Sequence, residues 1–409
     1  MKLLVWSQYY WPEGFQINDV TKSLLGKGVE IEVLTGKPNY PSGAILPGYR
    51  AWGCQQESHE SIRINRIPLL ARADSAWRLA LNYLSFVLSG LLFAPWMLRN
   101  KPFDVIFVYA PSPILQAIPA IFLGWLKGCP VVLWVQDLWP ESLVATGYVR
   151  NRYVVGAIRQ VVRYIYGHVD LLLVPSRAFE EPVRALASGT PIVYHPNSVD
   201  NSFAVPGVSD APAIAGLGDG FSVMFAGNIG TAQAVQVIIE AACLLQGYPD
   251  IHFVVLGDGS RRGWMQQEAQ RRGLGNVHLP GRFPVEIMPS LMQKASALLV
   301  TLADQPIFAA TVPNKVQAYM AAGRPIVACL NGEGARLVLE AEAGLTAPAE
   351  DPQALANTIQ SLYRMSSDQR EAMGANGRKY YQTHFDHDHL VGQLIGHLQD
   401  VSYGSGGEE

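Results

Sequence analysis

Short apolar runs, each followed by a loop and then by a helical pattern, recur along this chain of 409 residues. Residues 2–7 form the first run. Ile17, Val20 and Leu24 then recur at helical spacing, and residues 29–33 alternate as a strand does. A strand, a helix and a second strand in this order form a βαβ unit, whose strands are parallel. The opening of the chain therefore predicts an α/β fold.

The same pattern continues through both halves of the chain. Residues 201–220 interrupt it, since they are rich in Pro, Ala, Gly and Asp and lack periodicity. The length suffices for two domains. We therefore predict two α/β domains in tandem, with a cleft between them and ligands at the carboxyl ends of the strands. The further strands are predicted at 104–109, 131–135, 171–174, 221–226, 251–256, 297–301 and 325–329, and helices at 234–245 and 315–322.

Composition indicates the class of protein and the compartment in which we expect it. Hydrophobic residues make up 49% and charged residues 16% of the chain, which suits a large buried core. No basic segment followed by a long apolar stretch leads the chain, so we expect a cytoplasmic protein. Its four cysteines lack metal-ligand spacing and are expected to be buried thiols. Nothing indicates a nucleic-acid partner.

The charge is distributed unevenly between the halves. Residues 1–200 carry 18 basic and 14 acidic side chains, whereas residues 201–409 carry 13 and 20. A basic first half that faces an anionic surface would explain this difference. Chance asymmetry explains it equally well.

The second half of the chain contains two candidate anion sites, a glycine-rich turn and the start of a helix. Gly227–Thr231 lies between a predicted strand and helix, where glycines allow a phosphate to approach the backbone; glycines also simply make tight turns. Asn314 is a good helix N-cap, and Lys315 beside it opposes the helix dipole unless an anion binds there. A solvated surface lysine is the alternative.

In the first half, Asp137 follows the predicted strand at 131–135. A carboxylate at that end of a central strand points into the predicted cleft. Asp137 also suits a structural helix cap, and the pattern alone leaves both roles open.

Residues 79–98 contain no charged side chain, and arginines flank them. The length could just span a bilayer, but the segment lies within a βαβ pattern and holds Asn82 and Pro95. We predict a helix that is buried or lies at a membrane interface, with residues 72–101 as the membrane-contacting segment. A plain core helix is the alternative.

These segments together resemble family 4 glycosyltransferases, specifically the branch of WbuB-like and colanic-acid-type sugar transferases. The resemblance spans nearly the whole chain and rests on the order and spacing of its motifs. They are Tyr10–Gly14, Pro38–Gly43, Asp137–Ser142, Gly227–Gly230, Gly257–Gly259, Pro313–Lys315 and Ala321–Pro325.

The resemblance implies the GT-B fold, with two Rossmann-like domains, an interdomain cleft and a C-terminal helix that crosses back to the first domain. We expect an acceptor-binding domain at 1–203, a nucleotide-sugar-binding domain at 204–385, and the crossover helix and tail at 386–409. It also implies an acceptor site near Glu13, Gly14 and Asn18.

For the donor, the resemblance implies that Lys315 and Asn314 contact the diphosphate and sugar, that Gln317 contacts the ribose, and that Arg282 borders the base. The remaining donor contacts would come from Gly227, Asn228, Gly230, Gln233 and Arg261.

The chain departs from the family pattern around the donor. The family often has two glutamates separated by seven residues, where this chain has Ala309 and Gln317. Many relatives carry Arg and Lys after the glycine-rich turn, where this chain has Asn228 and Gln233. Lys315, with Arg261 or Arg262, would then neutralise the diphosphate. A third departure is Gln136, in place of a catalytic His.

The implied reaction is retaining transfer, in which the leaving diphosphate takes the acceptor proton. The enzyme must then supply positioning and charge stabilisation. We expect Asp137 and Lys315 to act in catalysis, with Asp137 orienting the acceptor hydroxyl or stabilising the oxocarbenium-like centre. No Asp-x-Asp motif lies in a suitable place, so we expect no metal, and no cofactor beyond the nucleotide-sugar substrate.

The resemblance therefore predicts transfer of a sugar, UDP-linked in this branch, to a polyprenyl-diphosphate-linked glycan in bacterial O-antigen, capsule or exopolysaccharide synthesis. The enzyme would attach peripherally to the inner face of the membrane. A non-catalytic partner subunit is one alternative, because of the missing glutamate pair. A nucleotide-sugar 2-epimerase is another, although the apolar stretch 307–311 lacks its acid and base groups.

Overall fold

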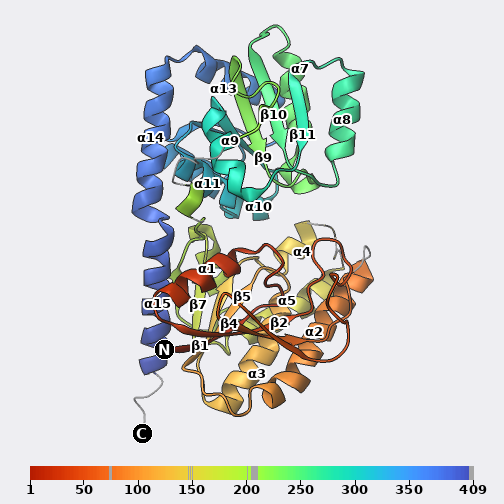
Figure 1. Ribbon diagram of the computed structural model, residues 1–409, viewed down its shortest axis with the longest axis vertical. Coiled ribbons are helices and arrows are strands. Elements are labelled where there is room, and N and C mark those ends of the chain that lie inside the picture. The colour runs from red at the N-terminus through yellow and green to blue at the C-terminus, as the bar shows by residue number, and fades with distance from the viewer. Residues whose placement is uncertain are drawn as a thin grey trace. The chain divides into compact units, whose positions relative to one another are not determined.

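The computed structural model describes residues 1–72, 76–145, 147, 149, 151–199, 201–203 and 211–404. Tertiary contacts divide the chain into two compact units (Figure 1). Unit 1 combines Met1–Pro196 with Asp388–Glu409, and unit 2 is Asn197–His387. The sequence places the domain boundary at 203/204, beside residues 204–210, which lie outside the described part of the chain.

Unit 1 is built on an eight-stranded sheet in the order β3-β4-β2-β1-β5-β6-β7-β8. Its neighbours are parallel, except that β3 and β4 form an antiparallel hairpin. Strand β1 lies between β2 and β5, with Leu3 opposite Ile31 and Val105. The strands are β1 (Lys2–Trp6), β2 (Glu30–Gly36), β3 (Gln55–His59), β4 (Ile62–Ile67), β5 (Val105–Ala110), β6 (Val131–Val135), β7 (Leu171–Val174) and β8 (Ile192–Tyr194).

Helices cover both faces of this sheet, which is why β5 and β6 are buried along their whole length. Helix α1 covers one face, where Ile17 packs with Leu3 and Val5. Helices α2 and α3 pack together on the other face, where Phe86 of α2 meets the Trp6 ring edge-on. The helices are α1 (Gln16–Gly26), α2 (Ala76–Met97), α3 (Ala117–Lys127), α4 (Glu141–Ala145), α5 (Arg152–Tyr166) and α6 (Glu180–Arg184).

Unit 2 has a six-stranded sheet in the order β11-β10-β9-β12-β13-β14, and all of its neighbouring strands are parallel. The strands are β9 (Phe221–Ala226), β10 (Ile251–Leu256), β11 (Val277–Gly281), β12 (Ala297–Thr301), β13 (Ile326–Cys329) and β14 (Gly344–Ala347). The helices are α7 (Gln236–Leu244), α8 (Arg262–Arg271), α9 (Met288–Lys294), α10 (Pro306–Ala310), α11 (Asn314–Ala322), α12 (Glu333–Glu340), α13 (Pro352–Arg364) and α14 (Ser367–His384).

The last helix, α15 (His387–Gly404), returns to unit 1. Val391, Leu394 and Leu398 are buried in the same core as Leu3 and Val5 of β1. Two parallel, helix-covered sheets and a returning C-terminal helix confirm the predicted fold class. Of the four free thiols, Cys129 and Cys329 are buried as expected, but Cys54 and Cys243 are partly exposed.

Candidate functional site

Three loops meet at the carboxyl edge of the sheet of unit 2. They follow β9, β10 and β11, which are neighbours in the sheet. Backbone hydrogen bonds join them: Gly227 N–H donates to Leu256 O at 2.9 Å, Ile229 N–H to Asp258 O at 2.8 Å, and Gly257 N–H to Gly281 O at 2.8 Å. The predicted phosphate-binding segments are therefore one connected structure.

Glycine is required where these loops cross. Gly257 has φ +132°, and a Cβ there would lie 1.9 Å from the carbonyl oxygen of Gly227. At Gly259 a Cβ would lie 2.5 Å from the carbonyl oxygen of Ile229. The close crossing of the two backbones, and not only a tight turn, explains these residues.

Lys315 lies against the first of these loops. It is the second residue of α11, and a Cβ on Gly227 would lie 2.6 Å from its Cε. Its Nζ is 3.8 Å from the centroid of the Phe225 ring. In the described part of the chain, no carboxylate forms an ion pair with it.

Burial lowers the pKa of the Lys315 ammonium to about 7, because the charged form loses solvation without gaining a counterion. An anion would restore the charged form. A half-buried ammonium at the start of a helix, beside a glycine-rich crossing, is a suitable seat for a diphosphate.

The two polar side chains predicted to approach the phosphates contact each other. Nδ2 of Asn228 donates to Oε1 of Gln233 at 3.5 Å. Gly230 makes room for this pair, since a Cβ there would lie 2.8 Å from Asn228 Nδ2. Asn228 is exposed, so its remaining hydrogen-bonding capacity faces solvent at the loop.

The predicted arginines flank the same loops. The backbone N–H of Arg261 donates to Ile229 O at 2.9 Å, and its guanidinium lies 4.5 Å from the centroid of the Trp264 ring. Arg282 follows β11 and is exposed. Within the described residues neither arginine forms an ion pair. Their charge adds to that of Lys315.

Asn314 and Gln317 hold the chain near the start of unit 2. The N-cap prediction for Asn314 is wrong: Pro313 is the N-cap, and Asn314 begins α11. Oδ1 of Asn314 accepts from Nδ2 of Asn197 at 3.0 Å, and Nε2 of Gln317 donates to Asn197 O at 2.7 Å. Gln317 is fully buried, and its Oε1 has no described hydrogen-bond partner. Its contact with a ribose stays a prediction.

In unit 1, the residues predicted to bind the acceptor build their own loops. The Glu13 carboxylate accepts from the N–H groups of Asn39 at 2.8 Å, Tyr40 at 2.7 Å and Tyr10 at 3.3 Å. Asn18 accepts from the N–H of Trp11 at 3.1 Å and donates to Glu13 O at 2.7 Å. Their acceptor role stays a prediction, beside a structural role that the motif alone did not reveal.

Gly14 differs from these two residues. It is exposed, and a Cβ there would meet no atom within 4 Å. The loop that Glu13 and Asn18 hold in place therefore presents an open backbone position at Gly14.

Asp137 lies just beyond β6 and is partly buried. Burial raises the pKa of its carboxyl to about 7, and no described cation or hydrogen bond lowers it. Burial raises the pKa of Tyr109 and Tyr166, and the charge of Asp137 raises both further. No helix-cap hydrogen bond to Asp137 is present among the described residues, so the structure gives no support to the capping alternative.

A polar cluster in unit 1 was not found from the sequence. Gln8, Asn82 and Gln116 are fully buried. The N–H of Gln8 donates to Gln116 Oε1 at 2.7 Å, and Gln8 Nε2 donates to Asn82 Oδ1 at 2.7 Å. Oε1 of Gln8 and Nε2 of Gln116 have no described partner. The one signal was Asn82, a polar residue within an apolar helix.

Comparison with known proteins decides the family. Residues 14–198 match the family model for a glycosyl transferase 4-like domain, and residues 220–365 match that for glycosyl transferases of group 1. The chain is a family 4 glycosyltransferase. The two matched segments lie in unit 1 and unit 2, respectively.

Other glycosyltransferases share the sequence and the fold. The chain is 26% identical over 345 residues to WcaI of Escherichia coli K12, which is named as a colanic acid biosynthesis glycosyl transferase. The matched region covers 79% of this chain and 82% of WcaI. Two solved structures are similar at low identity. A trehalose-6-phosphate synthase matches at TM-score 0.72 and 13% identity, over 97% of this chain and 99% of that one. Anabaena Alr3699/HepE in complex with UDP and glucose matches at TM-score 0.68 and 16%, over 98% and 100%. They show the GT-B fold of this glycosyltransferase.

Proposed function

We propose that this glycosyltransferase transfers a sugar, with retention of anomeric configuration, from a UDP-linked donor to a lipid-linked glycan in the synthesis of a bacterial surface polysaccharide. The proposal rests mainly on the candidate anion site of unit 2, formed by Lys315 and the loops that cross at Gly227 and Gly257. There the half-buried Lys315 ammonium, which has no ion-pair partner among the described residues, lies beside Gly227, where the loops cross at Gly257.

The choice of UDP and of a polysaccharide product draws on the relatives. HepE, which shares the fold, was solved with UDP and glucose, and WcaI is named for colanic acid biosynthesis.

Retention fits the chemistry that the described residues can supply. On the donor side, Lys315, with Arg261 and backbone N–H groups, would stabilise charge on the leaving diphosphate. That diphosphate would take the proton from the acceptor hydroxyl as the new glycosidic bond forms and the bond to the diphosphate breaks. The fold is shared with a trehalose-6-phosphate synthase studied for glycosyltransfer with retention. No metal or cofactor is needed for these steps.

On the acceptor side we propose that Asp137 acts on the incoming hydroxyl. With a pKa of about 7, its carboxyl can accept a hydrogen bond from that hydroxyl near neutral pH. The loop that contains Gly14 would border the acceptor.

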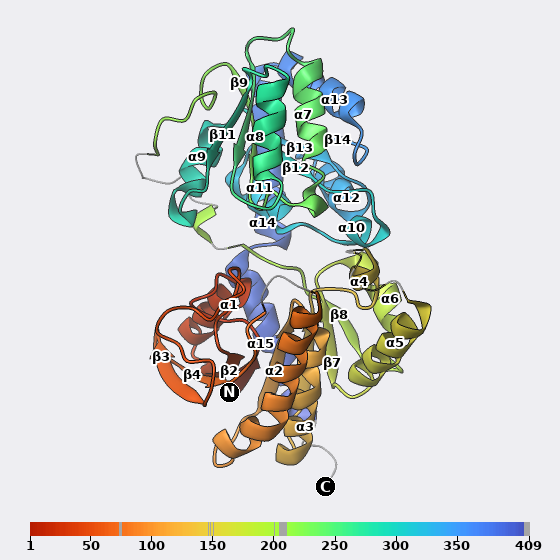
Figure 2. The same ribbon diagram turned by 90° about the vertical axis from the view of Figure 1, so that its right-hand side faces the viewer.

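A lipid-linked acceptor requires the enzyme to reach a membrane, and α2 suits this role. Helices α2 and α3 lie side by side (Figure 2) and contain no acidic residue. Together they expose nine large hydrophobic side chains, which we call the apolar face. They are Trp77, Leu81, Leu84, Leu88, Leu92 and Trp96 of α2, and Phe122, Trp125 and Leu126 of α3.

We propose that the apolar face rests on the membrane surface. By length and composition, Trp77–Met97 could cross a bilayer. Its other side, however, is part of the core of unit 1, where Phe86, Ala94 and Asn82 are fully buried. Peripheral contact keeps those residues packed and buries only the exposed side chains. Residues 73–75 of the predicted segment 72–101 lie outside the described residues.

The alternative of a non-catalytic partner subunit has one observation in its favour. Ala309 lies in α10 and has no carboxylate, at one of the two positions where the family often has a glutamate.

One experiment separates these candidates. The purified single chain is incubated with UDP-sugars and a membrane extract that contains lipid-linked glycans, and the product is examined by NMR. The proposal expects glycosyl transfer with the donor's anomeric configuration. An inverted product would overturn retention, and absence of transfer by the single chain with every donor would favour the partner subunit.

A further inference from the structure

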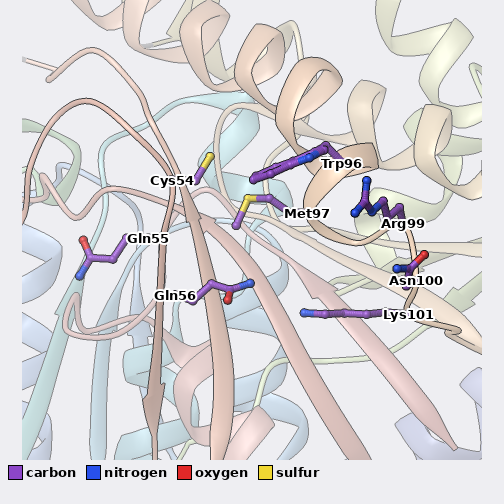
Figure 3. A pocket seen from close by; sticks show the side chains of 8 residues that line it. All are labelled: Cys54, Gln55, Gln56, Trp96, Met97, Arg99, Asn100 and Lys101. Atoms are coloured by element: carbon purple, nitrogen blue, oxygen red, sulfur yellow. The ribbon is translucent and has the colours of Figure 1, made fainter.

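The C-terminal end of α2 opens into a cavity of about 510 Å³ in unit 1 (Figure 3). Trp96 and Met97 form one wall, and Arg99, Asn100 and Lys101 of the following loop form another. Trp96 also belongs to the apolar face. The cavity and the apolar face are therefore continuous at this residue.

The loop of residues 98–101 is fixed by contacts with the side chains of Lys127 and Glu32. Nζ of Lys127, the last residue of α3, donates to Leu98 O and to Lys101 O, both at 2.8 Å. Nζ of Lys101 forms an ion pair with the Glu32 carboxylate. These three contacts fix the loop, so it forms a pre-organised wall of the cavity.

The charges around this loop do not balance. Arg99, Lys101 and Lys127 are basic, and Glu32 is the one carboxylate that pairs with any of them among the described residues. Lys127 is bonded to carbonyl oxygens. Arg99 is exposed and forms no described ion pair. The site therefore presents one guanidinium, that of Arg99, with which no described carboxylate pairs.

Two exposed tryptophans belong to the same region: Trp96 lines the cavity with Arg99, and Trp125 precedes Lys127 by two residues in α3. Trp96 is 63% exposed and Trp125, on α3, is 76% exposed. Tryptophan prefers the level of the lipid headgroups, between the acyl chains and water. Side chains at that level meet phosphate groups, and an arginine fork matches phosphate geometry.

We propose that this cavity, the loop 98–101 pocket, seats the phosphate headgroup of an anionic phospholipid. Arg99 would donate two parallel hydrogen bonds to the phosphate, and the Asn100 amide would donate to a further oxygen. The apolar face contacts the adjoining acyl chains. This inference rests on the membrane attachment proposed above, and it names the lipid class that this attachment selects.

The test measures binding of the full chain to vesicles of phosphatidylcholine, with and without phosphatidylglycerol, by co-sedimentation. The variants are Arg99→Ala and the matched control Arg78→Ala. Arg78 is also an exposed arginine of the same segment, but it lies at the opposite end of α2 and outside the cavity. We expect Arg99→Ala to lose about fivefold or more of the affinity for phosphatidylglycerol vesicles, and Arg78→Ala to lose clearly less.

A third variant separates a headgroup seat from diffuse attraction. Arg99→Lys keeps the charge and removes the fork, so a seat predicts that it recovers only part of the loss. Equal losses for Arg99→Ala and Arg78→Ala, or full recovery by Arg99→Lys, would overturn the headgroup pocket.

The vesicle assay contains neither donor nor acceptor, so its outcome is independent of the transferase reaction. If the unaltered protein binds no vesicle, the pocket and the membrane attachment fail together, while the transferase proposal stands. If it binds and the variants behave as expected, the pocket stands even if no transfer is detected.

Discussion

The fold uses Lys315 of unit 2 and the pair Glu13 and Asn18 of unit 1 in opposite ways. In unit 2, Lys315 has no ion-pair partner among the described residues, and backbone hydrogen bonds join the loops beside it. In unit 1, the side chains of Glu13 and Asn18 form hydrogen bonds with the backbone of their own and neighbouring loops. The fold thus leaves the Lys315 ammonium without a described partner, whereas it uses Glu13 and Asn18 to build loops.

The two units differ in which residues determine the conformation of these loops. The loops of unit 2 are shaped by glycine, since Gly257 and Gly259 allow two backbones to cross. This leaves the charged side chain nearby without a structural task. The loops of unit 1 at residues 10–13 and 39–40 are held instead by the buried carboxylate of Glu13. A motif residue is therefore best assigned to ligand binding when the fold does not already use its polar atoms.

The largest effect that would test this contrast is expected from Gly257→Ala. The added Cβ would overlap the carbonyl oxygen of Gly227, and φ +132° is unfavourable for alanine. We expect a loss of about 3 kcal/mol or more of unfolding free energy, together with loss of nucleotide binding. Urea denaturation measures the first quantity.

Gly263→Ala is the matched control for this prediction. Gly263 lies in the first turn of α8, and a Cβ there would meet nothing within 4 Å. This variant should be neutral or stabilising by about 0.5 kcal/mol. Equal behaviour of the two variants would show that the loop crossing does not depend on glycine.

A smaller effect is expected from Glu13→Gln in unit 1. The amide replaces one acceptor oxygen with a donor, so at least one of the three N–H groups that Glu13 satisfies loses its partner. We expect a loss of about 1–3 kcal/mol in unfolding free energy, with unchanged nucleotide affinity in unit 2. The exposed Glu181 provides the control Glu181→Gln. Unchanged stability with lost transfer would assign Glu13 to the acceptor instead.

The smallest effect concerns Asp137 and pH. Burial raises its pKa to about 7 in the folded protein, above the value of about 4 in an unfolded chain. The cost of the buried carboxylate is therefore fully present above about pH 7 and disappears as the pH falls toward about 4. Asp137→Asn removes this cost, so it should stabilise the protein at about pH 8 but not at about pH 4, by on the order of 1 kcal/mol since the side chain is partly solvated.

Thermal unfolding of both proteins across this pH range measures the difference. A stability difference that does not change with pH would mean that the Asp137 carboxyl titrates at its ordinary value.

Much of this architecture could be predicted from the sequence, because buried parallel strands are continuous apolar runs. The strands at 131–135, 171–174, 221–226, 251–256 and 297–301 occur with the predicted bounds. The β3–β4 hairpin was missed for two reasons. Its strand β3 is polar, and its turn uses Glu60 and Ser61 at φ +47° and +69° in place of the usual glycine or asparagine.

The candidate site was less accessible to sequence reasoning. The positions of Gly227 and Lys315 could be predicted, since Gly227 directly follows a strand and Lys315 lies at the start of a helix. The contacts of Glu13 with Asn39 and Tyr40 could not, because they join loops 26 and 27 residues apart. Asn314 was misread as an N-cap because Pro313 takes that place. A side chain's partners depend on tertiary structure, whereas its place on a strand or helix depends on its neighbours.

The central claim is that unit 2 holds an anion seat for a nucleotide diphosphate at Lys315. The most direct measurement is the thermal stability of the purified chain with UDP, GDP, ADP and dTDP, alone and as Lys315→Ala, with the exposed Lys294→Ala as control. A nucleotide at about 100 times its dissociation constant should add about 2.7 kcal/mol. The account predicts that UDP stabilises the unaltered protein and Lys294→Ala but not Lys315→Ala. Stabilisation by none of the four nucleotides, or an undiminished shift in Lys315→Ala, would contradict it.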